Sequence, residues 1–375
     1  MTTVHASSRR KFISNSALAL SAYALPAINF AATTERSFAP QPGTWRTFDV
    51  TTRVDLATAP GATQLWLPIP SVNSDWQQSL ESTFSSNGKT KLSSDGQQGV
   101  RMLYVDFPAD VAQPFVELTS RVRTQNRATA WANKQAVQED AATLRAYTIG
   151  TSLLPLDGIV RKTAMDATRG AHTDVEKAQK LYDWIVANTF REPKVRGCGE
   201  GDIRAMLETG NLGGKCADLN ALFVGLCRAV GLPARDVYGL RVAPSAFGYK
   251  ELGGNPDKLA GAQHCRAEIF LKGHGWVAMD PADVAKVMRQ ETAEWIRSPQ
   301  HPLVAPVNKG LFGGWEGNWI AYNTAHDVAL PFAKSANGGK VGFLMYPTAE
   351  NAVGRLDSYA PDSFKYQISA REIKA

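Results

Sequence analysis

The sequence has no long run of basic residues and no stripe of lysine and arginine interleaved with aromatic residues. Its formal net charge is +6, and Arg9, Arg10 and Lys11 supply half of that within the first 32 residues, which contain no acidic residue. The remainder is too weakly charged to indicate a nucleic-acid partner. After this first segment, no stretch is long and apolar enough to span a bilayer.

Cysteine is also scarce, with 4 in the chain: Cys198, Cys216, Cys227 and Cys265. They form no C-x-x-C pair and no Cys/His cluster with zinc spacing, so we predict no metal and no cofactor. Four cysteines in an exported chain would suggest two disulfides. A nucleophilic cysteine must stay free, which leaves at most one bridge. Cys227 lies about three helical turns after Cys216, so we expect a buried free thiol there.

The N-terminus has the pattern of an export signal. The basic stretch Ser8-Arg9-Arg10-Lys11-Phe12-Ile13-Ser14 precedes an apolar, alanine-rich segment that ends near Ala32. This resembles a twin-arginine signal, so we predict a signal peptide over residues 1–32 and a periplasmic protein. The alternative is a membrane-anchoring N-terminus, which a proline and polar residues inside the apolar segment disfavour.

The pattern along the chain changes three times. A linker over residues 36–43 leads into residues 44–127, where alternating apolar residues and turn-rich patches predict an N-terminal β-sandwich domain without recognisable chemistry. Helical periodicity then appears within residues 132–297, including a helix over 174–188 with a capping box at its start. Pro281 is expected to end the last of the core strands, and a further helix is expected over residues 283–297. We expect residues 298–375 to be an extension that packs on the core and has no active site.

The stretch from Gly213 to Phe223 is the centre of this organisation. Two glycines allow a sharp turn, and a helix begins at once and ends at Gly231. This helix is apolar on nearly every side, which predicts that it is buried. Cys216 lies at its N-terminus, where free N–H groups and the helix dipole favour an anion. We therefore expect Cys216 to have a lowered pKa and to act as a nucleophile.

A predicted β-hairpin supplies the partners for this thiol. His264 begins its first strand and Asp280 ends its second, so both lie at its open end. A nucleophilic thiol needs a base, and the base needs an acceptor on its other nitrogen, roles that His264 and Asp280 fit. A tight turn would leave the two residues out of register, and a wider turn or a bulge would be needed to place them directly opposite.

Four motifs in this order resemble those of the transglutaminase-like superfamily. They are Gly214-Lys215-Cys216-Ala217-Asp218-Leu219-Asn220, Ala229-Val230-Gly231-Leu232-Pro233-Ala234-Arg235, His264-Cys265-Arg266-Ala267-Glu268 and Gly275-Trp276-Val277-Ala278-Met279-Asp280-Pro281. The resemblance covers about residues 170–285 and implies an α+β fold with a papain-like core, in which a central helix packs on an antiparallel sheet. It also implies a triad of Cys216, His264 and Asp280. The sequence departs from the family at Arg266, where an aromatic residue is frequent.

The resemblance is greatest to exported bacterial members with an N-terminal β domain, which implies hydrolysis of a peptide or amide bond through a thioester on Cys216. Two alternatives stay open: an amine-accepting transglutaminase, and a binding or scaffold protein without activity. The Cys216 backbone N–H is a natural oxyanion donor, and Trp184 is a candidate for the second. The loop over residues 243–262 is expected to border the cleft. The sequence predicts neither the substrate nor the oligomeric state.

Other residues are expected to be structural. Asp218 and Asn220 lie in the first turn of the central helix and are expected to stabilise it. His172 and His274 are expected at the surface. His326-Asp327 lies near an aromatic cluster that we expect to pack the C-terminal segment against the core, with a glycan-stacking surface as the alternative. The members of this cluster are Trp315, Trp319 and Tyr322.

Overall fold

The computed structural model describes residues 36–56, 61–134, 137–334 and 339–374. The predicted signal peptide, residues 1–32, lies outside the described residues. Within the described ranges, no helix has both the length and the apolar character needed to cross a membrane.

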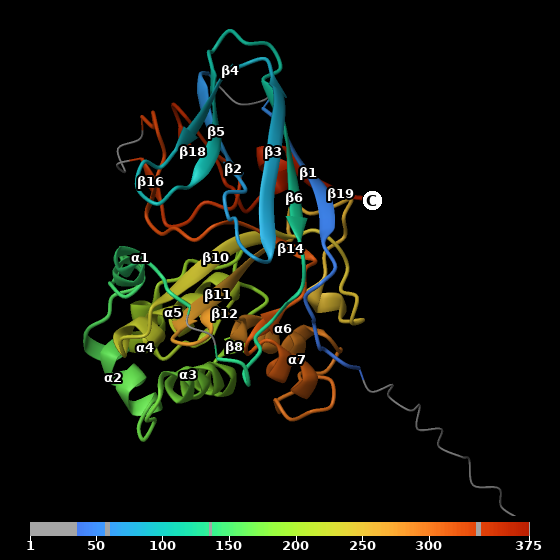
Figure 1. The fold of residues 1–375 in the computed structure, drawn as a ribbon. Coiled ribbons are helices and arrows are strands. Elements are labelled where there is room, and N and C mark those ends of the chain that lie inside the picture. The colour runs from blue at the N-terminus through green and yellow to red at the C-terminus, as the bar shows by residue number, and fades with distance from the viewer. Residues whose placement is uncertain (1–35, 57–60, 135–136, 335–338, 375) are drawn as a thin grey trace, which may run out of the picture. The chain divides into compact units, whose positions relative to one another are not determined.

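Two antiparallel sheets form a β-sandwich (Figure 1). The strands of the first sheet, in spatial order, are β19 (Tyr366–Ile373), β1 (Arg46–Asp55), β6 (Phe115–Thr124) and β3 (Gln77–Ser86). Those of the second are β18 (Gly354–Arg355), β17 (Thr348–Asn351), β2 (Thr63–Ile69), β5 (Arg101–Phe107) and β4 (Lys89–Ser94). Every second side chain of β6 is buried, as in a strand with one face on a core. Buried residues of both sheets, such as Val50 and Leu67, belong to one apolar cluster.

The C-terminal residues complete both sheets of this sandwich. Strand β19 pairs along the length of β1, and β17 pairs with β2. The sandwich strands therefore extend beyond the range 44–127 expected from the sequence, and part of the range 298–375 belongs to the sandwich as well as to the core. Without β19 and β17, the backbone groups of β1 and β2 would be unpaired along one edge. The sequence carries no local signal for pairing between segments so far apart.

A separate four-stranded antiparallel sheet holds the predicted hairpin. Its order is β12 (Gly275–Met279), β11 (Gln263–Leu271), β10 (Ala234–Arg241) and β14 (Trp319–Asn323). Helix α5 (Cys216–Ala229) packs against β11 and β10, and every one of its residues is buried. A central helix on an antiparallel sheet is the α+β arrangement expected, and the mixed fold is confirmed.

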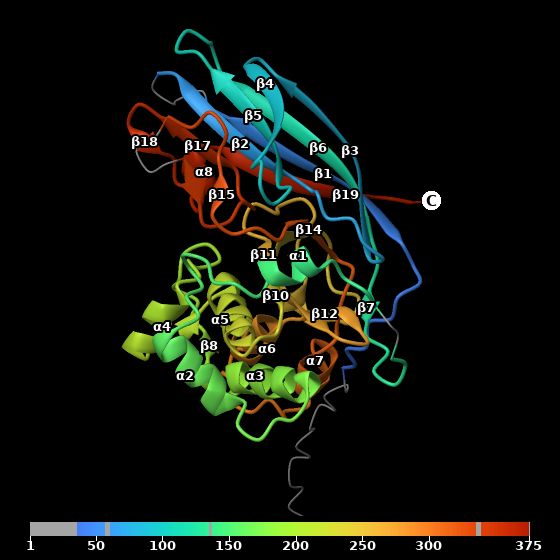
Figure 2. The same ribbon diagram turned by 60° about the vertical axis from the view of Figure 1, so that its left-hand side comes forward.

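Helices surround α5 on the side away from the sheet (Figure 2). Those in contact with it are α2 (Gly158–Ala167), α3 (Asp174–Asn188), α4 (Ile203–Thr209) and α6 (Pro281–Gln290). The predicted helix over 174–188 is confirmed, with Thr173 and Glu176 forming the capping box. The remaining elements are α1 (Ala141–Ala146), α7 (Ala305–Gly310), α8 (Pro361–Phe364), the 3₁₀ turn η1 (Lys250–Leu252), β7 (Arg127–Ala128), β8 (Phe190–Arg191), β9 (Gly213–Gly214), β13 (Gly314–Trp315), β15 (Val328–Ala329) and β16 (Lys340–Val341).

The predicted aromatic cluster lies where the sandwich meets the separate four-stranded sheet that contains β14. Trp315 and Trp319 are buried and pack on Trp76, which lies just before β3. The Gln77 side chain donates to Ala321 O at 2.8 Å and accepts from Ala321 N at 2.7 Å, which joins β3 to β14. The cluster is therefore a packing core, and the alternative of a glycan-stacking surface is wrong because the indole faces are covered.

Candidate active site

Cys216 is the first residue of α5, as the glycine pair before it predicted. Gly213 and Gly214 form β9, which pairs in parallel with β8. A Cβ atom on Gly214 would lie 2.6 Å from the Cβ of Asp218, so the chain can enter the helix this closely only with glycine. The Cys216 thiol thus starts a buried helix, near the positive end of its dipole.

Asp218 fixes the approach to this helix. Its carboxylate accepts hydrogen bonds from the backbone N–H groups of Lys215, Glu200 and Gly201, each at 2.9 Å. The first of these bonds caps α5, and the other two bind the glycine-rich loop over residues 197–201 to the helix. Asp218 stabilises the turn, as expected, and also holds a second segment of chain beside Cys216.

His264 and Asp280 meet across the end of the hairpin. His264 Nε2 lies 2.7 Å from Asp280 Oδ2, and both side chains are buried. The ladder from β11 to β12 pairs Ala267 with Met279 and has no bulge, so Asp280 continues opposite Arg266 rather than opposite His264. The two side chains span this diagonal offset, which is within their reach. Neither a wider turn nor a bulge is needed.

Asp283 is a second carboxylate at this imidazole that the sequence motifs did not single out. Its Oδ2 lies 3.3 Å from His264 Nε2, and its Oδ1 accepts from Arg241 at 2.6 Å. Asp283 follows Asp280 by one helical turn in α6, where Asp280 is the N-cap and accepts from the Asp283 N–H at 3.1 Å. The sequence did contain a signal for Asp283: it lies three positions after Asp280-Pro281, a pair typical of a helix start.

Arg266, which stands where the family frequently has an aromatic residue, enters the same network. Its Nε lies 3.5 Å from Asp280 Oδ2. Its guanidinium lies over the rings of Trp319 and Trp315, at 4.6 and 5.1 Å from the centroids. Arg266 thus adds a buried positive charge next to the carboxylate, supported by two aromatic faces.

Asn220 joins the helix to the hairpin directly. One turn after Cys216, its Nδ2 donates to Asp280 Oδ1 at 3.1 Å and to Cys265 O at 2.8 Å. Asp280 therefore has one oxygen on His264 and the other on Asn220. The expectation that Asn220 merely stabilises the first helical turn is too limited, because this side chain also positions Asp280.

The electrostatics of the site favour a thiolate on Cys216. Burial alone would raise the pKa of the Cys216 thiol, but polar contacts with Cys198 and Cys265 and the charge of His264 lower this pKa well below its usual value. Burial and Arg241 would lower the pKa of His264. The charges of Asp283, Asp280 and Cys216 outweigh them and raise the pKa of His264 to about 9. The favoured state at neutral pH is a thiolate–imidazolium pair.

Comparison with known proteins places this site in a family. The sequence pattern of the transglutaminase-like superfamily matches residues 161–281, which contain all three residues of the predicted triad. An uncharacterised protein of Haemophilus influenzae is 33% identical over 333 residues, covering 84% of this chain and 87% of the relative. The chain belongs to the transglutaminase-like superfamily.

One of the solved structures similar to this transglutaminase-like protein supports its fold. A structure described as that of a candidate cysteine protease from Cytophaga hutchinsonii superposes with a TM-score of 0.53 at 15% identity, over 89% of this chain and 93% of the other. The periplasmic domain of TgpA from Pseudomonas aeruginosa gives a TM-score of 0.33 at 15% identity, over 68% and 96% of the two chains.

Two groups of side chains in the transglutaminase-like core have metal-ligand chemistry. The sulfurs of Cys198, Cys216 and Cys265 lie within 4.8 Å of one another, and so do donor atoms of His264, Asp280 and Asp283. In the second group, Arg241 and Arg266 already supply positive charge to the carboxylates. All four cysteines, each among the described residues, are free and buried, and Cys227 has the state expected of it.

Access to the thiol is closed in this structure, since Cys216 and His264 are each only 3% exposed. A cavity of about 470 Å³ lies at the N-terminal end of α5 and is lined by Gly199, Gly213 and Asp218, among others. Tyr359 borders the same cavity and packs on the glycine-rich loop, where a Cβ on Gly197 would lie 2.4 Å from its ring.

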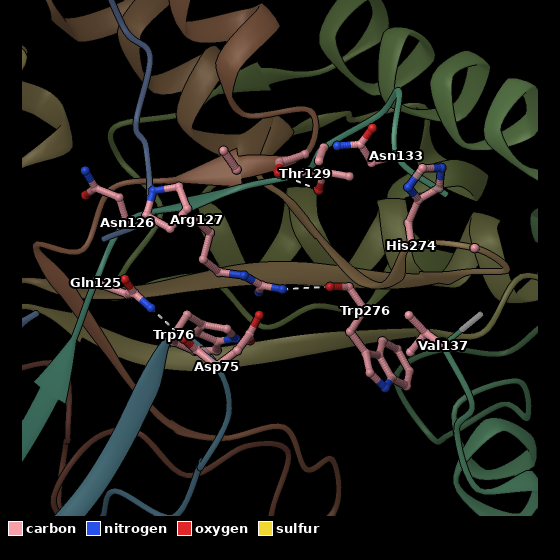
Figure 3. Close-up of a pocket in the computed structure, with 15 residues that line it drawn as sticks. Asp75, Trp76, Gln125, Asn126, Arg127, Thr129, Asn133, Val137, His274 and Trp276 are labelled. Carbon is pink, nitrogen blue, oxygen red and sulfur yellow. Dashed lines mark hydrogen bonds between the residues drawn. The ribbon is translucent and has the colours of Figure 1, made fainter. Parts of the chain in front are cut away.

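A second cavity, of about 270 Å³, is lined by a different set of residues (Figure 3). Arg127 crosses it and donates to the Trp276 carbonyl at 2.7 Å, and its other nitrogen binds the buried Glu268. His274 lines this cavity and is half-buried against Trp131 rather than fully exposed. Its lining contains none of the triad residues.

The other histidines and the predicted loop are placed as follows. His172 is exposed, as expected. His326 is buried, with Nε2 at 2.9 Å from Asp236 Oδ2 and Nδ1 at 3.1 Å from Thr151, which agrees with a structural role. The loop over residues 243–262 reaches the charge network where the Leu252 carbonyl accepts from Arg241 at 2.7 Å. The structure shows Trp184 half-buried on α3, and its oxyanion role stays a prediction.

Proposed function

We propose that this protein catalyses acyl transfer through a thioester on Cys216 and hydrolyses a peptide or amide bond in the periplasm. The observation that carries this proposal is the connection from helix to hairpin: Cys216 at the N-terminus of α5, His264 beside it, and Asp280 2.7 Å from His264 Nε2. Because Nε2 is occupied by Asp280, Nδ1 is the nitrogen left to exchange a proton with the thiol.

In the first step, the Cys216 thiolate attacks the carbonyl carbon of the scissile amide and forms a C–S bond. Negative charge develops on the carbonyl oxygen, and the backbone N–H of Cys216, at the helix N-terminus, is the proposed donor to it. The His264 imidazolium then protonates the amine as the C–N bond breaks, which leaves a thioester and a neutral imidazole.

In the second step, His264 removes a proton from water as the water oxygen attacks the thioester carbonyl. The C–S bond breaks, the acid product leaves, and the proton on His264 restores the ion pair with the thiolate. Asp280 keeps the imidazole in the orientation required in both steps, and Asn220 holds Asp280. A primary amine in place of water would give transamidation by the same residues. The resemblance to exported bacterial members of the superfamily supports water as the acceptor.

The test uses the purified chain without residues 1–32, the predicted signal peptide, and a pool of peptides and muropeptides, with products identified by mass spectrometry. We expect cleavage by the wild type and none by Cys216→Ala. Cys227→Ala is the matched control, because Cys227 is a buried thiol of the same helix that lies outside the sulfur cluster.

A glutamine peptide offered with and without a primary amine separates hydrolysis from transamidation. A transglutaminase would give the substituted amide, whereas the proposed hydrolase gives the acid in both cases. The enzyme proposal fails if Cys216 reacts with iodoacetamide as slowly as Cys198, Cys227 and Cys265, since a nucleophile without a reactive thiolate cannot form the thioester.

A further inference from the structure

The nucleophile is not the only thiol at the head of α5. The sulfurs of Cys198, Cys216 and Cys265 lie within 4.8 Å of one another, and all three are free. Catalysis as proposed uses one of them. A hydrolase requires no extra thiols beside its nucleophile, so the other two call for a separate explanation.

Cys198 is close enough to Cys216 for a disulfide. The Ala217 N–H donates to the Cys198 carbonyl at 2.9 Å, which brings the backbones of the two cysteines together directly. This bond keeps their Cα atoms less than about 8 Å apart, a limit that includes the range of about 4.4 to 6.8 Å that a disulfide spans. Cys198 lies on a loop between Gly197 and Gly199, at φ +53° and +92°, and its sulfur is already in the same cluster as that of Cys216.

Cys198 rests as a protonated thiol. Its sulfur accepts from the Tyr346 hydroxyl at 3.0 Å and donates to the Gln263 carbonyl at 3.2 Å. Burial raises the pKa of the Cys198 thiol, and contact with Cys216 raises it further. The pair thus combines a reactive thiolate with a neighbouring neutral thiol, which is the arrangement of an attacking and a resolving cysteine.

Cys265 is less suited to the resolving role. It lies within β11, paired with Tyr238 of β10, and its carbonyl is held by Asn220. Its sulfur contacts Met345 Sδ at 3.9 Å. The backbone of Cys265 is therefore tied to β10 and to Asn220, whereas that of Cys198 is hydrogen-bonded to Ala217, the residue next to Cys216.

We infer that Cys198 is a resolving thiol that converts peroxide-oxidised Cys216 into a reversible Cys198–Cys216 disulfide. The Cys216 thiolate attacks a hydroperoxide oxygen, forming a sulfenic acid as the O–O bond breaks. The Cys198 sulfur then attacks the Cys216 sulfur, the S–S bond forms, the S–O bond breaks, and the Cys198 proton leaves with the hydroxyl group as water. Together the two thiols lose two electrons, which reduce the peroxide to water.

The consequence is a protected and switchable site. A sulfenic acid left without a partner is oxidised further to the sulfinic acid, which thiol reductants do not reverse. The disulfide instead blocks the Cys216 sulfur until a dithiol reduces the S–S bond. This inference rests on the position and reactivity of the Cys216 thiol and requires no substrate, so it can be tested even if the proposed hydrolysis is wrong.

The test treats the reduced chain with hydrogen peroxide and follows it by intact mass and peptide mapping. We expect the wild type to lose two hydrogen atoms, to give a peptide crosslinked between Cys198 and Cys216, and to recover full iodoacetamide labelling of Cys216 after dithiothreitol. Cys198→Ser should form no such crosslink and should gain oxygen at Cys216 that dithiothreitol does not remove. Cys227→Ser should behave as the wild type.

Three results would overturn the inference: a crosslink that joins Cys216 to Cys265 instead, recovery of labelling in Cys198→Ser equal to that of the wild type, or peroxide-treated wild type with all four thiols intact. The wild-type crosslink is decisive even if Cys198→Ser fails to fold, because its mapping needs no variant. Failure of the proposed hydrolysis would appear as an absence of product from a fully reduced chain whose Cys216 still labels rapidly.

Discussion

Replacement of Asp280 by asparagine tests the electrostatic basis of the site. Asparagine has nearly the same shape, and its one oxygen can still accept from His264, but the charge beside His264 is lost. The amide NH2 then faces Asn220 and the Asp283 N–H, the two donors to Asp280 Oδ1. A hydrogen bond to a charged group stabilises by about 1 to 2 kcal/mol more than one between neutral groups. This difference corresponds to about one pKa unit. We therefore expect the pKa of His264 to fall from about 9 to about 8 and the pKa of Cys216 to rise by about one unit.

The assay is the rate of iodoacetamide labelling of Cys216 against pH, read by peptide mapping so that each thiol is followed separately. An ordinary thiol with a pKa of about 8.5 is only about 0.3% thiolate near pH 6. Wild-type Cys216, whose pKa is well below that of a free thiol, should label near its plateau rate there. In Asp280→Asn the acidic limb of the profile should move up by about one pH unit, which is about a tenfold loss of rate below the limb.

Asp236→Asn is the matched control. Asp236 is also a buried aspartate that binds a histidine, with Oδ2 2.9 Å from His326 Nε2, and it lies in the same sheet away from the thiol. It should leave the profile of Cys216 unchanged. If Asp280→Asn superimposes on the wild type, or if wild-type Cys216 titrates like a free thiol, the ion-pair reasoning is wrong.

Two further predictions concern stability, each measured as the free energy of unfolding in urea. Gly199→Ala should lower the free energy of unfolding by about 3 kcal/mol or more, because a Cβ there would lie 1.8 Å from the Asp218 carboxylate and displace it from its backbone donors. Gly210→Ala, also at positive φ but with open space around it, should lower it by only about 1 kcal/mol. Equal losses would contradict the role of Asp218. Burial opposes ionisation of Asp283, but Arg241 holds its pKa well below its usual value, so Asp283 should stabilise the wild type above about pH 4 and lose that contribution as the pH falls further. Arg241→Met should lower the free energy of unfolding by about 3 to 5 kcal/mol, because it leaves the Asp283 charge buried without its partner. The double variant Arg241→Met/Asp283→Asn should lose less stability and should lack the loss at acidic pH. A double variant less stable than Arg241→Met would contradict the pairing.

Local patterns were sufficient for the secondary structure of the core. The helix at Cys216 and the hairpin from His264 followed from apolar periodicity and glycine punctuation, and the structure has both within a residue or two. The helix expected over residues 283–297 begins earlier, at Pro281, and ends at Gln290. Its start was missed because Pro281 was interpreted as the end of a strand, although proline is also favoured in the first turn of a helix.

Contacts between distant segments could not be predicted in this way. Strand β19 completes a sheet with β1, more than 300 residues earlier in the chain, and no local residue pattern encodes that pairing. The same is true of Asp283 and Arg241, which meet His264 only after the hairpin and α6 have packed. Their effect on the imidazole depends on distances and burial, and neither quantity is a property of a sequence window.

The sequence by itself determined which residues have the chemistry and which elements carry them, because glycine conformation, helix periodicity and strand alternation act over a few neighbouring residues. It thus placed Cys216 at a helix start and His264 and Asp280 at the open end of one hairpin. Only the tertiary structure decided what surrounds the sulfur. The cluster of three thiols and the buried pairs that favour a thiolate arise because a glycine-rich loop, a strand and a helix converge, and the low dielectric that makes these charges matter exists only once the core has closed around them.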